Sequence, residues 1–201
     1  MMQAFSHEAS MAIERPVEIR GLIDCSPIIF GKCIGTKRYR NPRNGKEYEY
    51  SLFYGTQRWG VMVIPFTDQN ELIVVAQFRH GGNDIFYEFP GGGPDNPSEN
   101  PAEVAARELQ EETGFTTADI TLLADSLCID AANYLGRIRP FVARNCKLTH
   151  HQKLDATEHQ VEYIEVHCFS FQHWLNLIDT GRIIDAKTLA MTFLWMRRQH
   201  M

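Results

Sequence analysis

The sequence has few cysteines, and none of them has the spacing of a metal-binding pair. Five cysteines are widely scattered along the chain: Cys25, Cys33, Cys128, Cys146 and Cys168. No two form a Cys-x-x-Cys pair, and an odd, dispersed set indicates reduced thiols rather than a disulfide framework or a zinc site. We therefore expect a cytoplasmic protein whose cysteines are core or surface residues.

Long apolar runs and an excess of positive charge are also missing. The longest apolar runs, residues 61–66 and 72–76, are far shorter than a membrane span. The N-terminal residues contain no apolar signal core, so secretion is not expected. With 20 Lys and Arg against 25 Asp and Glu, the net charge is −5, which argues against a general nucleic-acid binder. We expect neither nucleic acid nor a membrane as a partner.

What is present is the composition of a globular protein. The 201 residues are 44% hydrophobic and 22% charged, with no repeat or low-complexity stretch. This length suits one well-buried domain with an appendage. We predict a β-rich segment over residues 1–58 and the main domain over residues 59–201.

Turn signals and apolar runs predict most of the strands. The turn signal at residues 41–45 predicts a hairpin between strands at residues 28–30 and 48–54. A second hairpin is predicted around residues 68–70, and its nearly continuous apolar strands indicate burial on both faces beneath helices. Further strands are expected near residues 121–128, 138–143 and 161–169.

One helix is marked at both ends. Asn100 can cap it, Pro101 suits its first position, and Gly114 supplies the left-handed residue beyond its end. This predicts a helix over residues 101–113, and two more are predicted over residues 171–180 and after Asp185. Strands and helices around one sheet, with a β-rich N-terminal extension, indicate the α/β or α+β class.

The helix at residues 101–113 carries a cluster of carboxylates. Glu108, Glu111 and Glu112 lie three and four positions apart, so they reach a shared rim although like charges at this spacing repel. Hard oxygen ligands without His or Cys favour Mg²⁺ or Mn²⁺ over zinc. The glycines at 91–93 let the backbone pass close to a cation and offer a carbonyl ligand. Metal-assisted attack on a phosphoanhydride is the chemistry that this pattern favours.

The whole stretch resembles the Nudix box, in which Gly, five residues, Glu and seven residues precede Arg-Glu-aliphatic-x-Glu-Glu-x-Gly and an aliphatic or aromatic residue. Every place is filled here: Gly93, Glu99, Arg107, Glu108, Leu109, Glu111, Glu112, Gly114 and Phe115. The resemblance implies a Nudix hydrolase with a mixed sheet sandwiched between helices. It also implies that the metal ligands are Glu108, Glu111, Glu112 and the Gly92 carbonyl, with Arg107 and Glu99 orienting the cluster.

Three flanking stretches are similar to the Nudix branch that cleaves ADP-ribose and nucleotide sugars: residues 75–92, 162–166 and 181–189. Within them, Arg79 is a candidate phosphate or ribose contact because a guanidinium suits bidentate oxygens, although a surface ion pair is the rival interpretation. Glu88 is a second candidate for the substrate site. Trp59 is a candidate for stacking a base, with a place in the core as the alternative.

The same branch implies a general base from an acidic loop before a late strand. Glu162 aligns best with that loop glutamate, and Glu158 is the second candidate. Together with Arg107 and Glu108, they complete the candidate catalytic residues. The rival reading of Glu162 is an exposed glutamate at the end of a strand.

These observations favour an Mg²⁺-dependent pyrophosphatase acting on ADP-ribose or a related nucleoside diphosphate sugar. The resemblance also implies a homodimer in which the segment 1–58 crosses to the partner. Two alternatives stay open. Tyr134 lies near the tyrosine of dinucleoside polyphosphate hydrolases, where the ADP-ribose branch often has a proline. A non-catalytic Nudix domain that senses a nucleotide sugar is the other alternative, disfavoured because every box glutamate is present.

Overall fold

The computed structural model describes residues 17–24, 32–40, 44–55, 58–79, 82–153 and 164–199. In chain order, these ranges contain β1 (Val17–Asp24), β2 (Lys32–Arg40), β3 (Glu47–Gly55), β4 (Trp59–Thr67), β5 (Leu72–Arg79), β6 (Asp84–Glu88), α1 (Pro101–Thr113), β7 (Phe115–Thr116), β8 (Asp119–Leu122), β9 (Leu127–Cys128), β10 (Arg137–Leu148), β11 (Ile164–Phe169), α3 (Phe171–Asp179) and α4 (Ala186–Gln199). The chain divides into two compact units. The smaller comprises Met1–Thr56 and Asp130–Leu135, and the larger comprises Gln57–Ile129 and Gly136–Met201.

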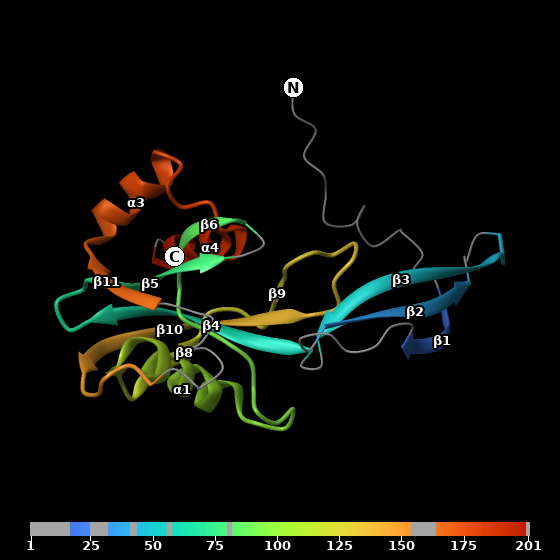
Figure 1. Ribbon diagram of the computed structural model, residues 1–201, viewed down its shortest axis with the longest axis horizontal. Helices are drawn as coiled ribbons and strands as arrows, with labels where there is room; N and C mark the ends of the chain where they lie inside the picture. The colour runs from blue at the N-terminus through green and yellow to red at the C-terminus, as the bar shows by residue number, and fades with distance from the viewer. Residues whose placement is uncertain are drawn as a thin grey trace. The chain divides into compact units, whose positions relative to one another are not determined.

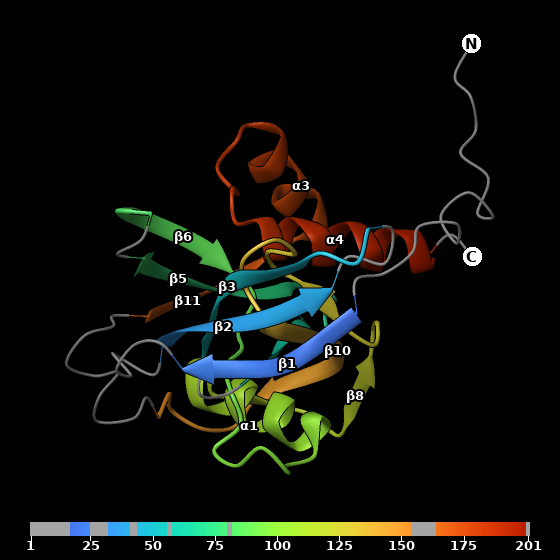
Figure 2. The same cartoon turned by 90° about the vertical axis from the view of Figure 1, so that its right-hand side faces the viewer.

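The smaller unit is built on an antiparallel sheet in the order β1-β2-β3 (Figure 2). Its β2–β3 hairpin confirms the predicted turn, with Gly45 at φ 70°. The predicted strand at residues 28–30 lies outside the described residues, and β2 takes its place in the hairpin. Residues 130–135 belong to this unit through β3, because the Phe53 N–H donates to the Asn133 carbonyl over 2.7 Å.

The larger unit contains a mixed sheet in the order β11-β5-β4-β10-β7, with β6 beside β5 and both β8 and β9 beside β10. β4 and β10 run parallel, whereas β5 is antiparallel to its neighbours β4, β6 and β11. The predicted β4–β5 hairpin is confirmed, with Asn70 in the left-handed region at φ 60°. The expected strand at residues 121–128 is instead divided into β8 and β9, and the chain between them includes Asp125, a residue type that strands disfavour.

Both faces of this sheet are buried, as the continuous apolar strands predict. On β4, Val61 and Val63 pack against Val104, Ala105 and Leu109 of α1. The alternate residues of β4 face a second core cluster, which includes side chains from α3 and α4: Met62, Ile64, Phe66, Trp174 and Met191. Figure 1 shows α1 on one side of the sheet and α3 and α4 on the other. The larger unit therefore has the predicted layering, with a mixed sheet between helices.

The helix boundaries follow the local signals closely. The Asn100 side chain accepts a hydrogen bond from the Ala102 N–H, and Gly114 ends α1 at φ 76°. Asp185 caps α4 by accepting from the Thr188 N–H over 2.9 Å. Among the described residues, no helix has the length and apolar character that crossing a bilayer requires.

Candidate active site

The helix α1 presents two carboxylates to the sheet. Glu108 and Glu112 are each only 8% exposed, and they share the inward side of the helix with Val104, Ala105 and Leu109. Glutamate is almost never fully buried without a partner, because an ionised carboxylate loses its hydration. Two buried glutamates on the core-facing side of one helix are therefore a functional signal and not a solvated face.

The glycines that precede α1 come close to these carboxylates. The Gly91 N–H donates to Glu112 Oε2 over 2.9 Å. A Cβ at Gly92 would lie 2.6 Å from the carboxylate atoms of Glu108, so only glycine fits there without a shift of Glu108. The Gly92 carbonyl accepts from the Val61 N–H over 2.8 Å, which fixes it at the edge of β4. The start of β4, the glycine segment and α1 thus come together beside the carboxylates of Glu108 and Glu112.

Arg107 holds the cluster from its outer side. Its guanidinium contacts Glu108 Oε1 at 3.0 Å and Glu111 Oε2 at 2.8 Å, and it donates to the Gly93 carbonyl over 2.8 Å. Burial alone would lower the pKa of Arg107, but the negative charges of Glu108 and Glu111 outweigh it and raise that pKa. Arg107 is therefore a fixed positive charge that orients two of the three glutamates proposed as metal ligands.

Glu99 lies outside this set of contacts. Its Oε1 accepts from the Asn96 N–H over 2.8 Å, within the loop that leads to α1. This contact shapes the loop before the helix.

The oxygen donors present here fit a hard divalent cation. Carboxylates of Glu108, Glu111 and Glu112, with the second lone pair of the Gly92 carbonyl, make an oxygen-only set of the kind that Mg²⁺ or Mn²⁺ prefers. Only glycine at position 92 leaves the space beside Glu108 open. Within the ranges that the structure describes, no three Asp, Glu, His or Cys side chains already converge as a metal-binding group.

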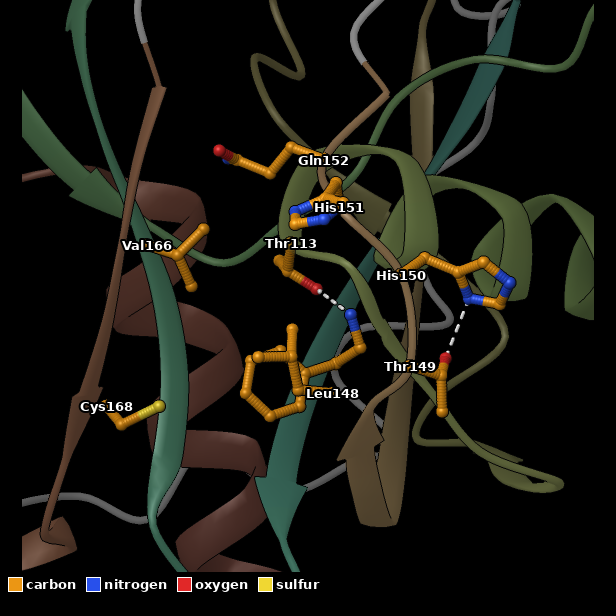
Figure 3. A pocket seen from close by; sticks show the side chains of 9 residues that line it. Thr113, Leu148, Thr149, His150, His151, Gln152, Val166 and Cys168 are labelled. Atoms are coloured by element: carbon orange, nitrogen blue, oxygen red, sulfur yellow. Dashed lines mark hydrogen bonds between the residues drawn. The ribbon is translucent and has the colours of Figure 1, made fainter.

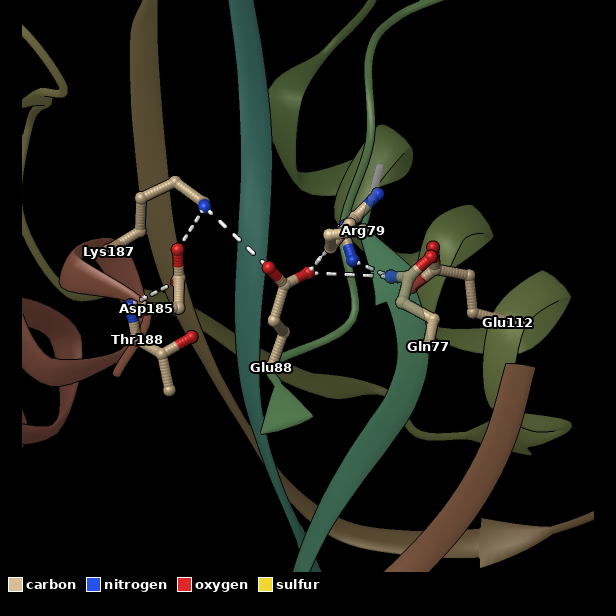
Figure 4. Close-up of polar contacts among 8 residues, drawn as sticks. Gln77, Arg79, Glu88, Glu112, Asp185, Lys187 and Thr188 are labelled. Carbon is tan, nitrogen blue, oxygen red and sulfur yellow. Dashed lines mark hydrogen bonds and ion pairs between the residues drawn. The ribbon is translucent and has the colours of Figure 1, made fainter. Parts of the chain in front are cut away.

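Arg79 and Glu88, both candidates for substrate binding, lie in one ion-pair network (Figure 4). Arg79 Nε donates to Glu88 Oε2 over 2.9 Å, and Glu88 is only 3% exposed. The ion pair that was the rival interpretation of Arg79 is thus present, and its partner is a buried carboxylate. Glu88 thus holds the Arg79 guanidinium in place, and a direct contact of Glu88 with substrate stays a prediction.

Trp59 lies at the start of β4. It is partly buried against the core cluster under α1, and the guanidinium carbon of Arg139 lies 5.7 Å from its ring centroid. The structure therefore gives Trp59 both a packing role and an exposed side.

Some candidate residues lie elsewhere or outside the described residues. Glu158 and Glu162, the candidate bases, fall outside them. Tyr134 belongs to the smaller unit, whereas the carboxylate cluster belongs to the larger one.

Two residues to which the sequence assigned no role, Lys187 and Gln77, contact Glu88 in the structure. Lys187 Nζ lies 3.8 Å from Glu88 Oε1, and Gln77 Nε2 donates to Glu88 Oε2 over 3.4 Å. Both stand in stretches already similar to the ADP-ribose branch, which was the only signal for them.

A separate pocket of about 550 Å³ opens beyond the C-terminal end of α1 (Figure 3). Its lining includes Phe115, His150, Gln152 and Cys168, and burial raises the pKa of the Cys168 thiol. None of the described candidate site residues lines it, so this pocket is not where the carboxylates meet.

Comparison with known proteins agrees with this geometry. Residues 56–189 match the NUDIX domain family. The chain belongs to the Nudix family of hydrolases. Nudix hydrolases generally need a divalent metal, which agrees with the oxygen-only donor set on α1.

Two curated Nudix relatives are similar over much of their length. An ADP-ribose pyrophosphatase of Bacillus subtilis is 30% identical over 130 residues, which are 64% of this chain and 66%, just under two thirds, of that protein. The ADP compounds hydrolase NudE of Escherichia coli is 26% identical over 159 residues, 78% of this chain and 81% of that protein.

A solved structure shares the Nudix fold. The crystal structure of an ADP compounds hydrolase matches with a TM-score of 0.75 at 22% identity, covering 94% of this chain and 97% of that one. The predicted fold class, α+β with a mixed sheet, is confirmed.

Proposed function

We propose that this Nudix hydrolase cleaves the pyrophosphate bond of ADP-ribose or a related nucleoside diphosphate sugar, with Mg²⁺ or Mn²⁺ as its cofactor. The products are a nucleoside monophosphate and a sugar phosphate. The observation that carries the proposal is the burial of Glu108 and Glu112 against Gly91 and Gly92. The two curated relatives support the substrate class, since their names specify ADP-ribose and ADP compounds.

In this proposal the residues of α1 hold the metal and the substrate diphosphate in place. Glu108, Glu111, Glu112 and the Gly92 carbonyl are its ligands, and Arg107 keeps Glu108 and Glu111 in position. A bound divalent cation supplies charge neutralisation of the diphosphate and a lower pKa for water. Arg79 is the proposed contact to a phosphate or ribose oxygen, and Trp59 is the proposed stacking partner for the base.

The reaction is hydrolysis of a phosphoanhydride. Water attacks one phosphorus, its P–O bond to the bridging oxygen breaks, and the second phosphate leaves with that oxygen. We assign the proton of the attacking water to Glu162, with Glu158 as the second candidate. A Glu162→Gln variant that kept a near-normal kcat at saturating Mg²⁺ would remove this assignment.

We further propose that the protein is cytoplasmic and forms a homodimer through the smaller unit. Ile34 and Phe53 pair across β2 and β3 and are 39% and 54% exposed. Exposed apolar neighbours on an exposed sheet face are typical of an association surface.

One assay tests the proposed reaction. The purified protein is incubated with Mg²⁺ or Mn²⁺ and with ADP-ribose, other sugar nucleotides, diadenosine polyphosphates and nucleoside triphosphates. We expect the highest kcat/KM for ADP-ribose or another nucleoside diphosphate sugar. Preference for diadenosine polyphosphates would replace the substrate assignment, and no turnover of any compound would point to the sensing alternative.

A further inference from the structure

Glu88 is a buried anion that needs positive partners. Its side chain is 3% exposed at the end of β6, where an ionised carboxylate is costly unless it is paired. One carboxylate oxygen of Glu88 faces β5, and the other faces α4. Oε2 accepts from Arg79 and Gln77 of β5, while Oε1 faces Lys187 Nζ of α4 at 3.8 Å.

Lys187 is itself held by the start of its own helix. It forms an ion pair with Asp185, whose other carboxylate oxygen caps α4 through the Thr188 N–H at 2.9 Å. Figure 4 shows Asp185, Lys187, Glu88 and Arg79 in one continuous chain of contacts. Two cations and two carboxylates balance in charge, and Lys187 lies between the carboxylates of Glu88 and Asp185. A positioning role suits it better than anion binding.

The segment that follows Glu88 leads directly to the carboxylate cluster. The Pro90 carbonyl accepts from the Val63 N–H over 2.9 Å, and the Gly91 N–H donates to Glu112 over 2.9 Å. Phe89 lies between Glu88 and Pro90 in the chain and packs on Trp174 of α3, with ring centroids 5.3 Å apart. A displacement of Glu88 would therefore be passed within a few residues to the Gly92 carbonyl and to Glu112.

We infer that Lys187 is a positioning residue, which acts through Glu88 on Arg79 and on the glycine segment that completes the metal site. The inference rests on the proposed function, because it assigns Lys187 to the site that holds the metal. It gives a role to the 181–189 stretch, for which the sequence indicated only a resemblance. It also explains why α4 begins against the end of β6.

The test measures Mn²⁺ binding to the full-length protein by electron paramagnetic resonance, without substrate. Lys187→Met is expected to weaken Mn²⁺ binding about tenfold or more, as loss of residues that orient metal ligands does. Lys187→Arg keeps the charge and is expected to restore most of the affinity. In the assay with substrate, kcat should fall more than KM rises, because Lys187 does not contact substrate.

Leu189→Ala is the matched control, since the Leu189 side chain packs α4 on the core, and the bond from its main-chain N–H to the Asp185 carbonyl is kept in alanine. It should lower the melting temperature at least as much as Lys187→Met but leave Mn²⁺ binding within about twofold of the wild type. Equal loss of Mn²⁺ binding in both variants would overturn the inference, because α4 packing alone would then explain it.

A double-mutant cycle keeps the inference testable if Lys187→Met is insoluble alone. Glu88→Gln removes the buried charge, so adding Lys187→Met to it should weaken Mn²⁺ binding by less than about twofold more. A further tenfold loss of Mn²⁺ affinity in the double variant would contradict the inference that Lys187 acts through Glu88. Failure of the wild type to bind Mn²⁺ or to hydrolyse nucleotides would instead defeat the proposed function.

Discussion

Three glutamates on one short helix repel each other, and the surrounding residues offset this repulsion. Each like-charge pair at this spacing costs a few tenths of a kcal/mol in a helix, and burial of Glu108 and Glu112 costs more. Arg107 offsets part of this through ion pairs with Glu108 and Glu111. The Gly91 N–H supplies a donor to Glu112.

Gly92 gives the sharpest prediction for a single residue. In Gly92→Ala, the new Cβ would meet the Glu108 carboxylate at 2.6 Å and displace it. We expect Mn²⁺ affinity and kcat to fall about tenfold or more, while the free energy of unfolding falls by no more than about 2 kcal/mol. Calorimetric Mn²⁺ titration with urea unfolding on the same samples checks this, and unchanged Mn²⁺ affinity would contradict it.

The sequence alone predicted which residues form the box and that they share one helix. It did not predict which of them are buried or what they contact. The identities and spacing of Glu108, Glu111 and Glu112 are local, and so is their assignment to one helix. That Glu108 and Glu112 face the sheet depends on packing against β4. The pairing of Glu88 with Lys187 joins residues far apart in the chain, and no spacing rule indicates it.

At the scale of secondary structure elements, the ends of the helices were predictable because their signals are local. Asn100 and Gly114 delimit α1 as predicted, and Asp185 caps α4. The ends of the strands were less predictable from the sequence, because a strand's pairing partner determines where the strand is interrupted. β8 and β9 pair with different parts of β10, at residues 141–144 and 137–138, which the apolar pattern could not show.

Gly114 and Gly181 form a matched pair for testing the helix ends. Both have positive φ, 76° and 70°, but a Cβ at Gly114 would lie 2.4 Å from the His150 carbonyl oxygen, whereas one at Gly181 would meet nothing within 4 Å. Gly181→Ala should cost about 1 kcal/mol from backbone strain alone, and Gly114→Ala about 2 kcal/mol or more. Urea unfolding measures both, and equal losses would show that the close contact is relieved at no cost.

Asp185 gives a pH-dependent prediction. Burial raises the pKa of its carboxyl, but hydrogen bonds from Lys187 and the Thr188 N–H outweigh this and hold that pKa below its usual value. The unfolded chain therefore binds the proton more readily, so the stabilisation is complete above about pH 4 and is lost as pH falls through the lowered folded pKa.

We therefore expect Asp185→Ala to lower the free energy of unfolding by about 1–2 kcal/mol at pH 7, through loss of the cap. The difference from the wild type should shrink as pH falls below about 4. Urea unfolding at pH 7 and pH 3.5 measures it. Asp179→Ala, an exposed change at the end of α3, should stay within about 0.5 kcal/mol at both values. A difference that grew on acidification would contradict the assigned direction.

At the scale of the whole molecule, the two units differ in what the sequence revealed. The larger unit has an apolar core and a motif, and both its fold class and its layers were predicted. Residues 130–135 join the smaller unit by bonds between the main chains of Phe53, Asn133 and Leu135. The order of side chains in the sequence does not indicate main-chain hydrogen bonds between distant segments, so the sequence did not predict that residues 130–135 belong to the smaller unit.

The proposed homodimer is tested on Ile34 and Phe53. The double variant Ile34→Thr, Phe53→Lys removes their exposed apolar surface and should shift the protein from dimer to monomer in light scattering coupled to gel filtration. Leu148→Ser, which alters a 66% exposed side chain of the larger unit, should leave the dimer intact. A wild type that runs as a monomer at all concentrations would remove the dimer from the proposal.

We expect the buried glutamates of α1 to hold the metal for pyrophosphate hydrolysis, and the Glu112→Gln variant separates this role from a structural one. The amide oxygen can still accept from the Gly91 N–H, and removing a buried charge should leave the melting temperature equal or higher. We predict that kcat for ADP-ribose falls about a hundredfold or more at every Mg²⁺ concentration. A folded Glu112→Gln protein that hydrolyses ADP-ribose at the wild-type rate would contradict the account.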